Sequence, residues 1–177
     1  MPRSPTVDEP AALPARRRLP LMVACAFALQ NAGAAGMGPY RLLKPIPIGG
    51  EGHWDIVTVD SPAHRLYLAR STTVVVVDLT KDQEAGEITD TPGVHALAVE
   101  PGTNRGYSSH GKEAKASVVD LTTLKTISKI DTGEGPYAMR YDGKRGELYG
   151  CNTKGNSTTE LDATDAKVLA TIQRTCR

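Results

Sequence analysis

A block of sequence recurs three times at a nearly constant spacing, and this recurrence limits the fold more than any other feature of the chain. In each copy an acidic residue stands seven positions before a tyrosine. The three pairs are Asp60 and Tyr67, Glu100 and Tyr107, and Asp142 and Tyr149. A second landmark is an aspartate after a β-prone run, which recurs every 42 residues at Asp78, Asp120 and Asp162. A period near 40 indicates similar structural units that stack on one another.

Each copy contains four short β-prone runs that are separated by clusters of Gly, Pro, Asp and Asn. In the first copy these runs are residues 56–59, 65–69, 73–77 and 84–88. Short runs of this kind between turn residues predict β-strands. Four strands per repeat of about 40 residues is typical of a propeller blade. We therefore predict an all-β fold of β-propeller blades, each with four antiparallel strands, in about three repeats of 40–42 residues.

These landmarks divide the chain into six predicted segments. They are a signal peptide (1–34), a lead-in strand of a blade (35–48), blade 1 (49–92), blade 2 (93–134), blade 3 (135–172) and an irregular tail (173–177).

The first segment has the order of residue types that marks a protein for export. Three arginines, Arg16–Arg18, precede the apolar run Leu19–Leu29, and the small residues Ala32 and Ala34 follow in the spacing of a cleavage site. The apolar run is about half the ~20 residues that a spanning helix needs. We expect a cleaved signal, a periplasmic or secreted protein, and no stable membrane span after cleavage.

The repeats resemble the YVTN-repeat β-propellers, in particular the bacterial YncE-like group. The matching residues include Asp60 with Arg65 and Tyr67, Val77-Asp78-Leu79, and Gly133-Glu134-Gly135-Pro136. The third copy departs from this pattern, because Glu147 stands where the other copies have arginine. The resemblance spans residues 40–172. It implies the propeller fold but no particular activity.

Three repeats are fewer than the roughly four to eight blades of a closed ring. The repeat also breaks off at a blade junction, over residues 173–177. A fragment of a longer propeller is the favoured explanation. The alternatives are a ring completed by several copies of a short chain, and an open arc. Terminal blades would expose apolar surface and strand edges, so we expect self-association through open edges.

The repeat register predicts where a ligand would bind. The innermost strands of the three blades begin near Asp55, His95 and Tyr137, and the second strands end near Arg70, His110 and Asn152. Antiparallel strands place these two sets at the same end of the blades. We expect the six side chains to surround the mouth of the central channel, with Trp54 as a stacking wall. The alternative is that they are merely solvated strand ends.

Other functions have weaker support. His53, Asp55, His95 and His110 could suit a transition metal, but no close ligand spacing is present, so we predict neither a metal nor a cofactor. A net charge of +1 does not favour nucleic acid. We predict an exported, non-catalytic module that binds an unknown protein or small-molecule ligand. The alternative is part of a propeller enzyme, a lactonase-like hydrolase or a quinone-dependent oxidoreductase, with its site on the channel face.

Overall fold

The computed structural model describes residues 40–173, and all of its strands lie in the compact unit that begins at Pro45. The expected signal peptide falls on residues 1–34, outside the described residues. Of the other unit, Met1–Lys44, only residues 40–44 are described, and they have no regular secondary structure. No helix of the described part is long and apolar enough to cross a membrane.

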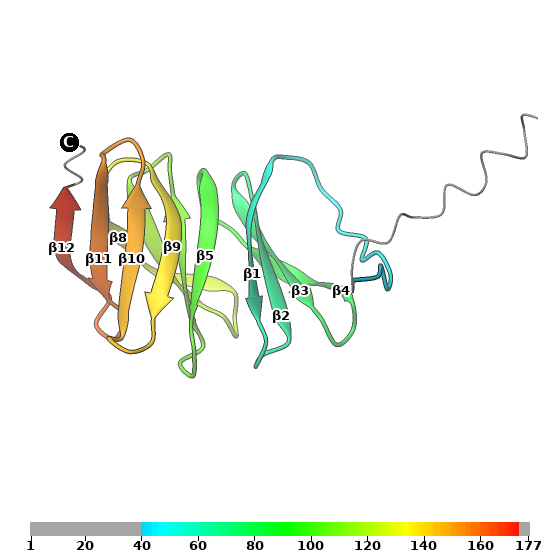
Figure 1. The fold of residues 1–177 in the computed structure, drawn as a ribbon. Helices are drawn as coiled ribbons and strands as arrows, with labels where there is room; N and C mark the ends of the chain where they lie inside the picture. Colours follow the sequence, from blue (N-terminus) through cyan, green and yellow to red (C-terminus); the bar gives the residue numbers. More distant parts are fainter. Residues whose placement is uncertain (1–39, 174–177) are drawn as a thin grey trace, which may run out of the picture. The chain divides into compact units, whose positions relative to one another are not determined.

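The described residues form twelve β-strands in three four-stranded antiparallel sheets (Figure 1). The predicted all-β fold of three blades is confirmed. Blade 1 contains β1 (Trp54–Asp60), β2 (Arg65–Arg70), β3 (Thr73–Asp78) and β4 (Gln83–Ile88). Blade 2 contains β5 (Val94–Glu100), β6 (Arg105–His110), β7 (Lys115–Asp120) and β8 (Lys125–Asp131). Blade 3 contains β9 (Pro136–Asp142), β10 (Glu147–Asn152), β11 (Ser157–Asp162) and β12 (Lys167–Gln173).

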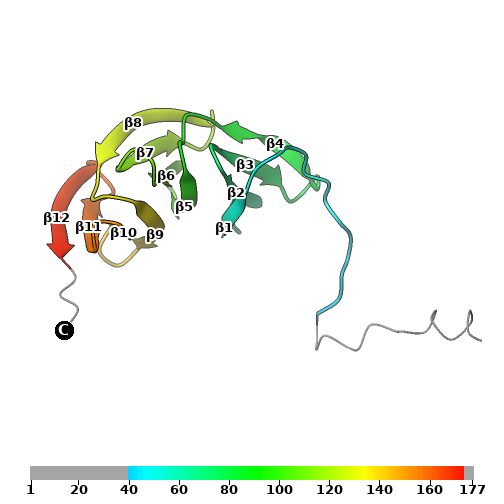
Figure 2. The same cartoon turned by 90° about the horizontal axis from the view of Figure 1, so that it is seen from above.

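Within the unit that begins at Pro45, the blades follow one another around an arc (Figure 2). The first strand of each blade, β1, β5 or β9, lies on the concave side, and the last strand, β4, β8 or β12, lies on the convex side. Each sheet takes its strands in chain order. This arrangement brings the beginnings of the three first strands close to one another.

The aspartates that follow the third strands close the turns to the fourth strands. Asp78 Oδ1 accepts hydrogen bonds from the backbone N–H groups of Thr80 and Lys81 at 2.8 and 3.1 Å. Asp120 Oδ1 accepts equivalent hydrogen bonds from two backbone N–H groups in the turn that follows it, at 2.8 and 2.9 Å. The Thr80 hydroxyl also donates to Asp78 Oδ1, and this bond, together with the backbone bonds, stabilises the ionised carboxylate and lowers the pKa of Asp78 to about 2. The backbone bonds of the second turn likewise lower the pKa of Asp120. The repeated aspartates therefore shape turns.

Two apolar clusters fill the junctions between neighbouring blades. Between blades 1 and 2, Tyr67, Val76 and Ile88 pack on Leu97 and Leu121. Between blades 2 and 3, the members are Ala98, Tyr107, Val118, Ile130, Leu148, Leu161 and Ala163. Of the three tyrosines that mark the repeat, Tyr67 and Tyr107 are buried in these clusters, whereas Tyr149 is only half-buried.

The lead-in strand expected within residues 35–48 is absent from its described part, residues 40–48, which has no regular secondary structure. A segment becomes a strand only when a sheet edge pairs with its backbone. Each of the three described sheets takes all four of its strands from a single repeat. No edge in the described residues therefore pairs with this segment. At the other end, β12 extends to Gln173, one residue into the segment expected to be irregular.

Candidate functional site

The same β-bulge occurs at the beginning of the first strand of every blade. In β1 the register shifts between Trp54 and Val57, and in β5 it shifts between Val94 and Leu97. In β9 the shift lies opposite Gly150 and Asn152. A bulge places two residues opposite one and redirects their side chains. Asp55, His95 and Tyr137 are the first extra residues of the three bulges, so all three are turned in the same way.

The three bulge residues form one hydrogen-bonded cluster across three blades. His95 Nδ1 lies 2.8 Å from Asp55 Oδ2, and the Tyr137 hydroxyl donates to Asp55 Oδ1 at 3.0 Å. The His95 and Tyr137 rings are stacked, with centroids 4.2 Å apart. We call this cluster the Asp55–His95–Tyr137 triad. It unites one carboxylate, one imidazole and one phenol that are distant in the sequence.

The triad is open to solvent. The side chains of Asp55 and His95 are 25% and 31% exposed, and Tyr137 is 37% exposed. The carboxylate of Asp55 only accepts hydrogen bonds, so Nδ1 of His95 carries the proton in this pair. The pKa of Tyr137 is raised because its hydroxyl donates to a negatively charged group. The phenol therefore stays neutral and keeps its place in the cluster.

A buried serine holds two of the bulges together. Ser109 Oγ accepts a hydrogen bond from Ala96 N at 3.1 Å, inside the bulge of β5. The same hydroxyl donates to the carbonyl oxygen of Tyr137 at 2.6 Å, in the next blade. Ser109 is therefore a positioning residue that sequence reasoning missed. The sequence indication of this role is residue size, because the equivalent positions in the other two blades hold the small residues Ala69 and Cys151.

The other three residues expected at the channel mouth do not reach the triad. His110 is fully buried, and its ring nitrogens lie 3.0 Å from Ser108 Oγ and 3.4 Å from Glu113 Oε2. Asn152 is also buried, and its Nδ2 donates to Ser157 Oγ and Thr159 Oγ1 at 3.0 and 2.8 Å. The expectation that six side chains converge is wrong for these two residues. Burial lowers the pKa of His110, since the charged imidazole would lose its hydration.

Arg70 also points into its own blade. Its guanidinium forms an ion pair with Glu87 and donates to the Gly49 carbonyl oxygen. The Trp54 ring lies over this guanidinium, with the Arg70 Cζ atom 5.4 Å from the ring centroid, which is a cation–π contact. Trp54, which directly precedes Asp55 in β1, is 46% exposed, so part of its ring remains open to solvent.

A cleft of about 650 Å³ lies at the opposite end of β1 and β5, between blades 1 and 2. Asp60, Arg65, Tyr67, Val99 and Leu121 are among the residues that line it. The Tyr67 hydroxyl has no hydrogen-bond partner among the described residues. Nowhere in residues 40–173 do three or more His, Cys, Asp or Glu side chains gather in a way that could hold a metal ion.

The fold defines a set of β-propeller blades, and the triad gives them a polar cluster at one end of the inner strands. Over 120 residues, 65% of its length, the chain is 31% identical to YncE of Salmonella typhi and of Salmonella typhimurium. Both relatives are described as uncharacterized proteins. The chain is thus homologous to YncE over this region, which confirms the resemblance in its repeats. It spans about a third of the length of these relatives, namely 33%.

Solved structures support the same fold. The chain matches hydrazine synthase of Kuenenia stuttgartiensis with a TM-score of 0.63 and 20% identity, over 67% of this chain and 35% of that one. It matches U3-55K and the RRP9 WD40 repeats with TM-scores of 0.64 and 8% identity, over 72% of this chain and 41% and 40% of theirs. At such identities the likeness concerns the fold alone. No protein-family profile matches the chain.

Proposed function

We propose that this chain is an exported, non-catalytic binding module that recognises a ligand or a protein through the Asp55–His95–Tyr137 triad. The observation that carries the proposal is the convergence of three polar side chains from three blades on one solvent-open point. A binding surface on a propeller draws its groups from several blades in this way. The predicted signal sequence in residues 1–34 supports export.

The hydrogen bonds within the triad favour recognition. The imidazole and the phenol both direct a proton at the Asp55 carboxylate, which fixes the orientation of the two rings. The stacked rings of His95 and Tyr137 present an aromatic surface, and His95 Nε2 remains available as a hydrogen-bond acceptor. Such a surface suits a small polar molecule or an exposed loop of a protein that offers a hydrogen-bond donor beside a flat group.

A ligand screen with matched variants tests this proposal. A panel of monosaccharides, free amino acids and short peptides would be screened against the purified chain by heteronuclear NMR. A compound that shifts the signals of His95 and Tyr137 is expected to lose at least tenfold in affinity in Asp55→Asn, which removes the charged acceptor of the triad. The control is Glu84→Gln, which changes an exposed carboxylate on β4.

Two outcomes would contradict the proposal. One is a panel in which no compound perturbs the triad. The other is a compound that binds Asp55→Asn as tightly as the unaltered chain. Export has its own test, because mass spectrometry of the protein recovered from the periplasmic fraction or the medium should find Ala35 as its first residue.

A further inference from the structure

The cleft between blades 1 and 2 places polar and apolar side chains opposite each other. Blade 1 directs four polar side chains at blade 2 there, namely Thr58, Asp60, Arg65 and Tyr67. Blade 2 contributes the apolar side chains of Val99 and Leu121. The volume of about 650 Å³ is within the range of small-molecule pockets, roughly 300–1,000 Å³. The cleft is therefore large enough for a small molecule with one polar and one apolar side.

Small residues of blade 2 leave room for this cleft, whereas blade 3 has large residues at the same positions. Val99 and Tyr141 are equivalent, because each directly precedes the acidic residue that ends the first strand of its blade. Val99 pairs with Gly106, but Tyr141 pairs with Leu148 and packs against the apolar cluster of the second junction. The first junction is therefore more open at this point than the repeat requires.

A buried hydroxyl in the lining of the cleft has a proton to donate. Tyr67 lines the cleft, and its hydroxyl has no hydrogen-bond partner among the described residues. Arg65 lies close by, but a guanidinium only donates, so the phenol proton has no acceptor. Burial raises the pKa of Tyr67, so the hydroxyl keeps this proton. At the second junction, by contrast, the Tyr107 hydroxyl donates to the Ala163 carbonyl oxygen. A ligand in the cleft can supply the acceptor that Tyr67 lacks.

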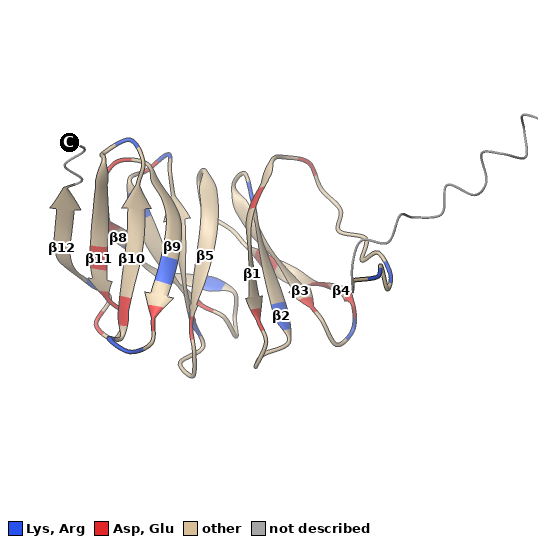
Figure 3. Ribbon diagram, in the orientation of Figure 1, with Lys and Arg blue, Asp and Glu red and all other residues tan. Residues whose placement is uncertain are grey.

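Two opposite charges lie side by side in the lining. Asp60 pairs in register with Arg65, and Figure 3 shows an acidic end of β1 beside a basic start of β2. Asp60 Oδ1 accepts a hydrogen bond from Ala63 N at 3.2 Å, and Arg65 donates one of its five N–H groups to the Leu121 carbonyl oxygen. Neither side chain forms an ion pair within residues 40–173. Both therefore retain hydrogen-bonding groups for a ligand.

The charge balance of the cleft favours a ligand that carries both charges. Glu100 also lines the cleft, but it shares the side of β5 with Ala98, which packs toward blade 3. The charged side chains that blade 1 directs into the cleft are thus one carboxylate and one guanidinium. A ligand with a single charge is attracted by one of them and repelled by the other, whereas a zwitterion complements both.

We propose that this cleft is a second ligand site, which binds a free α-amino acid with an apolar side chain. The ammonium group of the ligand binds the Asp60 carboxylate, and its carboxylate accepts hydrogen bonds from Arg65 and from the Tyr67 hydroxyl. The apolar side chain packs on Val99 and Leu121. An α-amino acid carries its two charges on one carbon atom, which suits two charged side chains at directly paired strand positions. The site lies at the ends of β1 and β5 and is separate from the triad at their beginnings.

Heteronuclear NMR titration of the purified chain with L-leucine and with L-phenylalanine tests this proposal. The backbone amide signals of Val99 and Gly102 report on the cleft, and the signals of His95 and Tyr137 report on the triad. Matched analogues each lack one charged group of the probes. Isoamylamine and phenethylamine lack the carboxylate, and isocaproate and hydrocinnamate lack the ammonium group.

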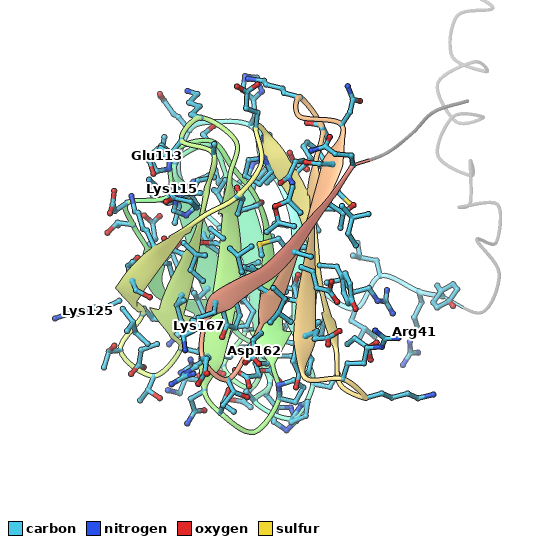
Figure 4. The ribbon with its side chains drawn as sticks, turned by 90° about the vertical axis from the view of Figure 1, so that its left-hand side faces the viewer. Arg41, Glu113, Lys115, Lys125, Asp162 and Lys167 are labelled. Carbon is cyan, nitrogen blue, oxygen red and sulfur yellow. The ribbon has the colours of Figure 1, made fainter. Side chains whose placement is uncertain are left out.

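Two variants alter the cleft in different ways. Val99→Tyr introduces the residue that the second junction already accommodates and fills the space for the ligand side chain. Asp60→Asn removes the negative charge and keeps an oxygen that can accept from Ala63 N. Val168→Tyr is the matched control, because it makes the same change at a valine that is 43% exposed on β12. Figure 4 labels Lys167, the first residue of that strand.

We expect both amino acids to shift the cleft signals, with affinities at least tenfold lower in Val99→Tyr and Asp60→Asn and unchanged in Val168→Tyr. The amines and the acids should bind at least tenfold more weakly than the amino acids.

Several results would overturn the proposal. They are amino acids that leave the cleft signals unchanged or shift only those of the triad, full affinity in either cleft variant, and an amine or acid that binds as tightly as its parent amino acid. Circular dichroism would establish that each variant is folded, and Asp60→Asn decides alone if Val99→Tyr is not.

Discussion

Tyr67 and Tyr107 occupy equivalent positions at the two blade junctions, but only Tyr107 forms a hydrogen bond to the next blade. Comparing them therefore measures what this bond contributes to the free energy of unfolding. The Tyr107 hydroxyl donates to the Ala163 carbonyl oxygen across the second junction. At the first junction the Tyr67 hydroxyl has no partner among the described residues, and the equivalent carbonyl oxygen, that of Leu121, accepts from Arg65 alone of the two side chains. Both tyrosines are at least 99% buried. Replacement of each by phenylalanine removes the same oxygen from two different environments.

The expected changes in the free energy of unfolding have different signs. Tyr107→Phe loses a buried hydrogen bond, which costs about 0.5–1.5 kcal/mol. Ala163 O keeps its contact with Arg105 at 3.5 Å, so no larger penalty for an abandoned acceptor is added. Tyr67→Phe removes a buried hydroxyl without a partner. We expect its free energy of unfolding to be unchanged or to rise by up to about 1 kcal/mol. The two variants should therefore differ by about 0.5–2.5 kcal/mol.

Urea unfolding followed by circular dichroism would measure the difference. The midpoint should move down for Tyr107→Phe and stay or move up for Tyr67→Phe, with the slope m unchanged in both. In thermal unfolding, about 1 kcal/mol corresponds to a shift of roughly 2–4 °C for a domain of this size. Equal losses in the two variants would refute the reasoning, because they would show that the phenol oxygens have equivalent partners at both junctions.

Three further predictions concern ionisation. Asp55→Asn should lower the pKa of Tyr137 toward its ordinary value near 10, since the charged acceptor is removed, and an NMR titration of the tyrosine ring would measure it. Burial lowers the pKa of His110, so the unfolded chain binds its proton first as the pH falls below about 6.5. The stability that depends on neutral His110 is therefore present above that pH and is lost below it, and His110→Asn should remove this part of the pH dependence of urea unfolding. The Tyr149 hydroxyl donates to Glu147 Oε2 at 2.6 Å, and this bond is the main reason that the pKa of Tyr149 is raised to about 12. Glu147→Gln should therefore lower this pKa, as ultraviolet titration of the phenolate would show. An unchanged pKa would contradict the bond between Tyr149 and Glu147.

The strands and turns of the fold could be predicted from the sequence because they depend on local signals. Alternation within short β-prone runs defines strands, and the aspartates that end the third strands define turns through bonds to neighbouring amides. These signals recur every 40 to 42 residues, so one blade predicts the others. The predicted lead-in strand is absent from residues 40–48 because it does not depend on local signals alone. A strand at residues 40–48 depends on a distant sheet edge, which local pattern does not contain.

The candidate site shows where prediction from local register ends. Counting along the repeat placed six side chains at one end of the blades, namely Asp55, His95, Tyr137, Arg70, His110 and Asn152. The count did not show which of them face solvent.

The sequence by itself determined the repeat, the all-β blades and the strand ends that carry polar residues, because each of these follows from interactions between near neighbours in the chain. Tertiary structure decided which of those residues meet. The bulges turn Asp55, His95 and Tyr137 toward one another, whereas His110 and Asn152 lie on second strands that pair with the third strands of their blades without a shift. Whether two polar side chains bond across blades depends on bulges and on blade packing, and both arise only when the sheets stack.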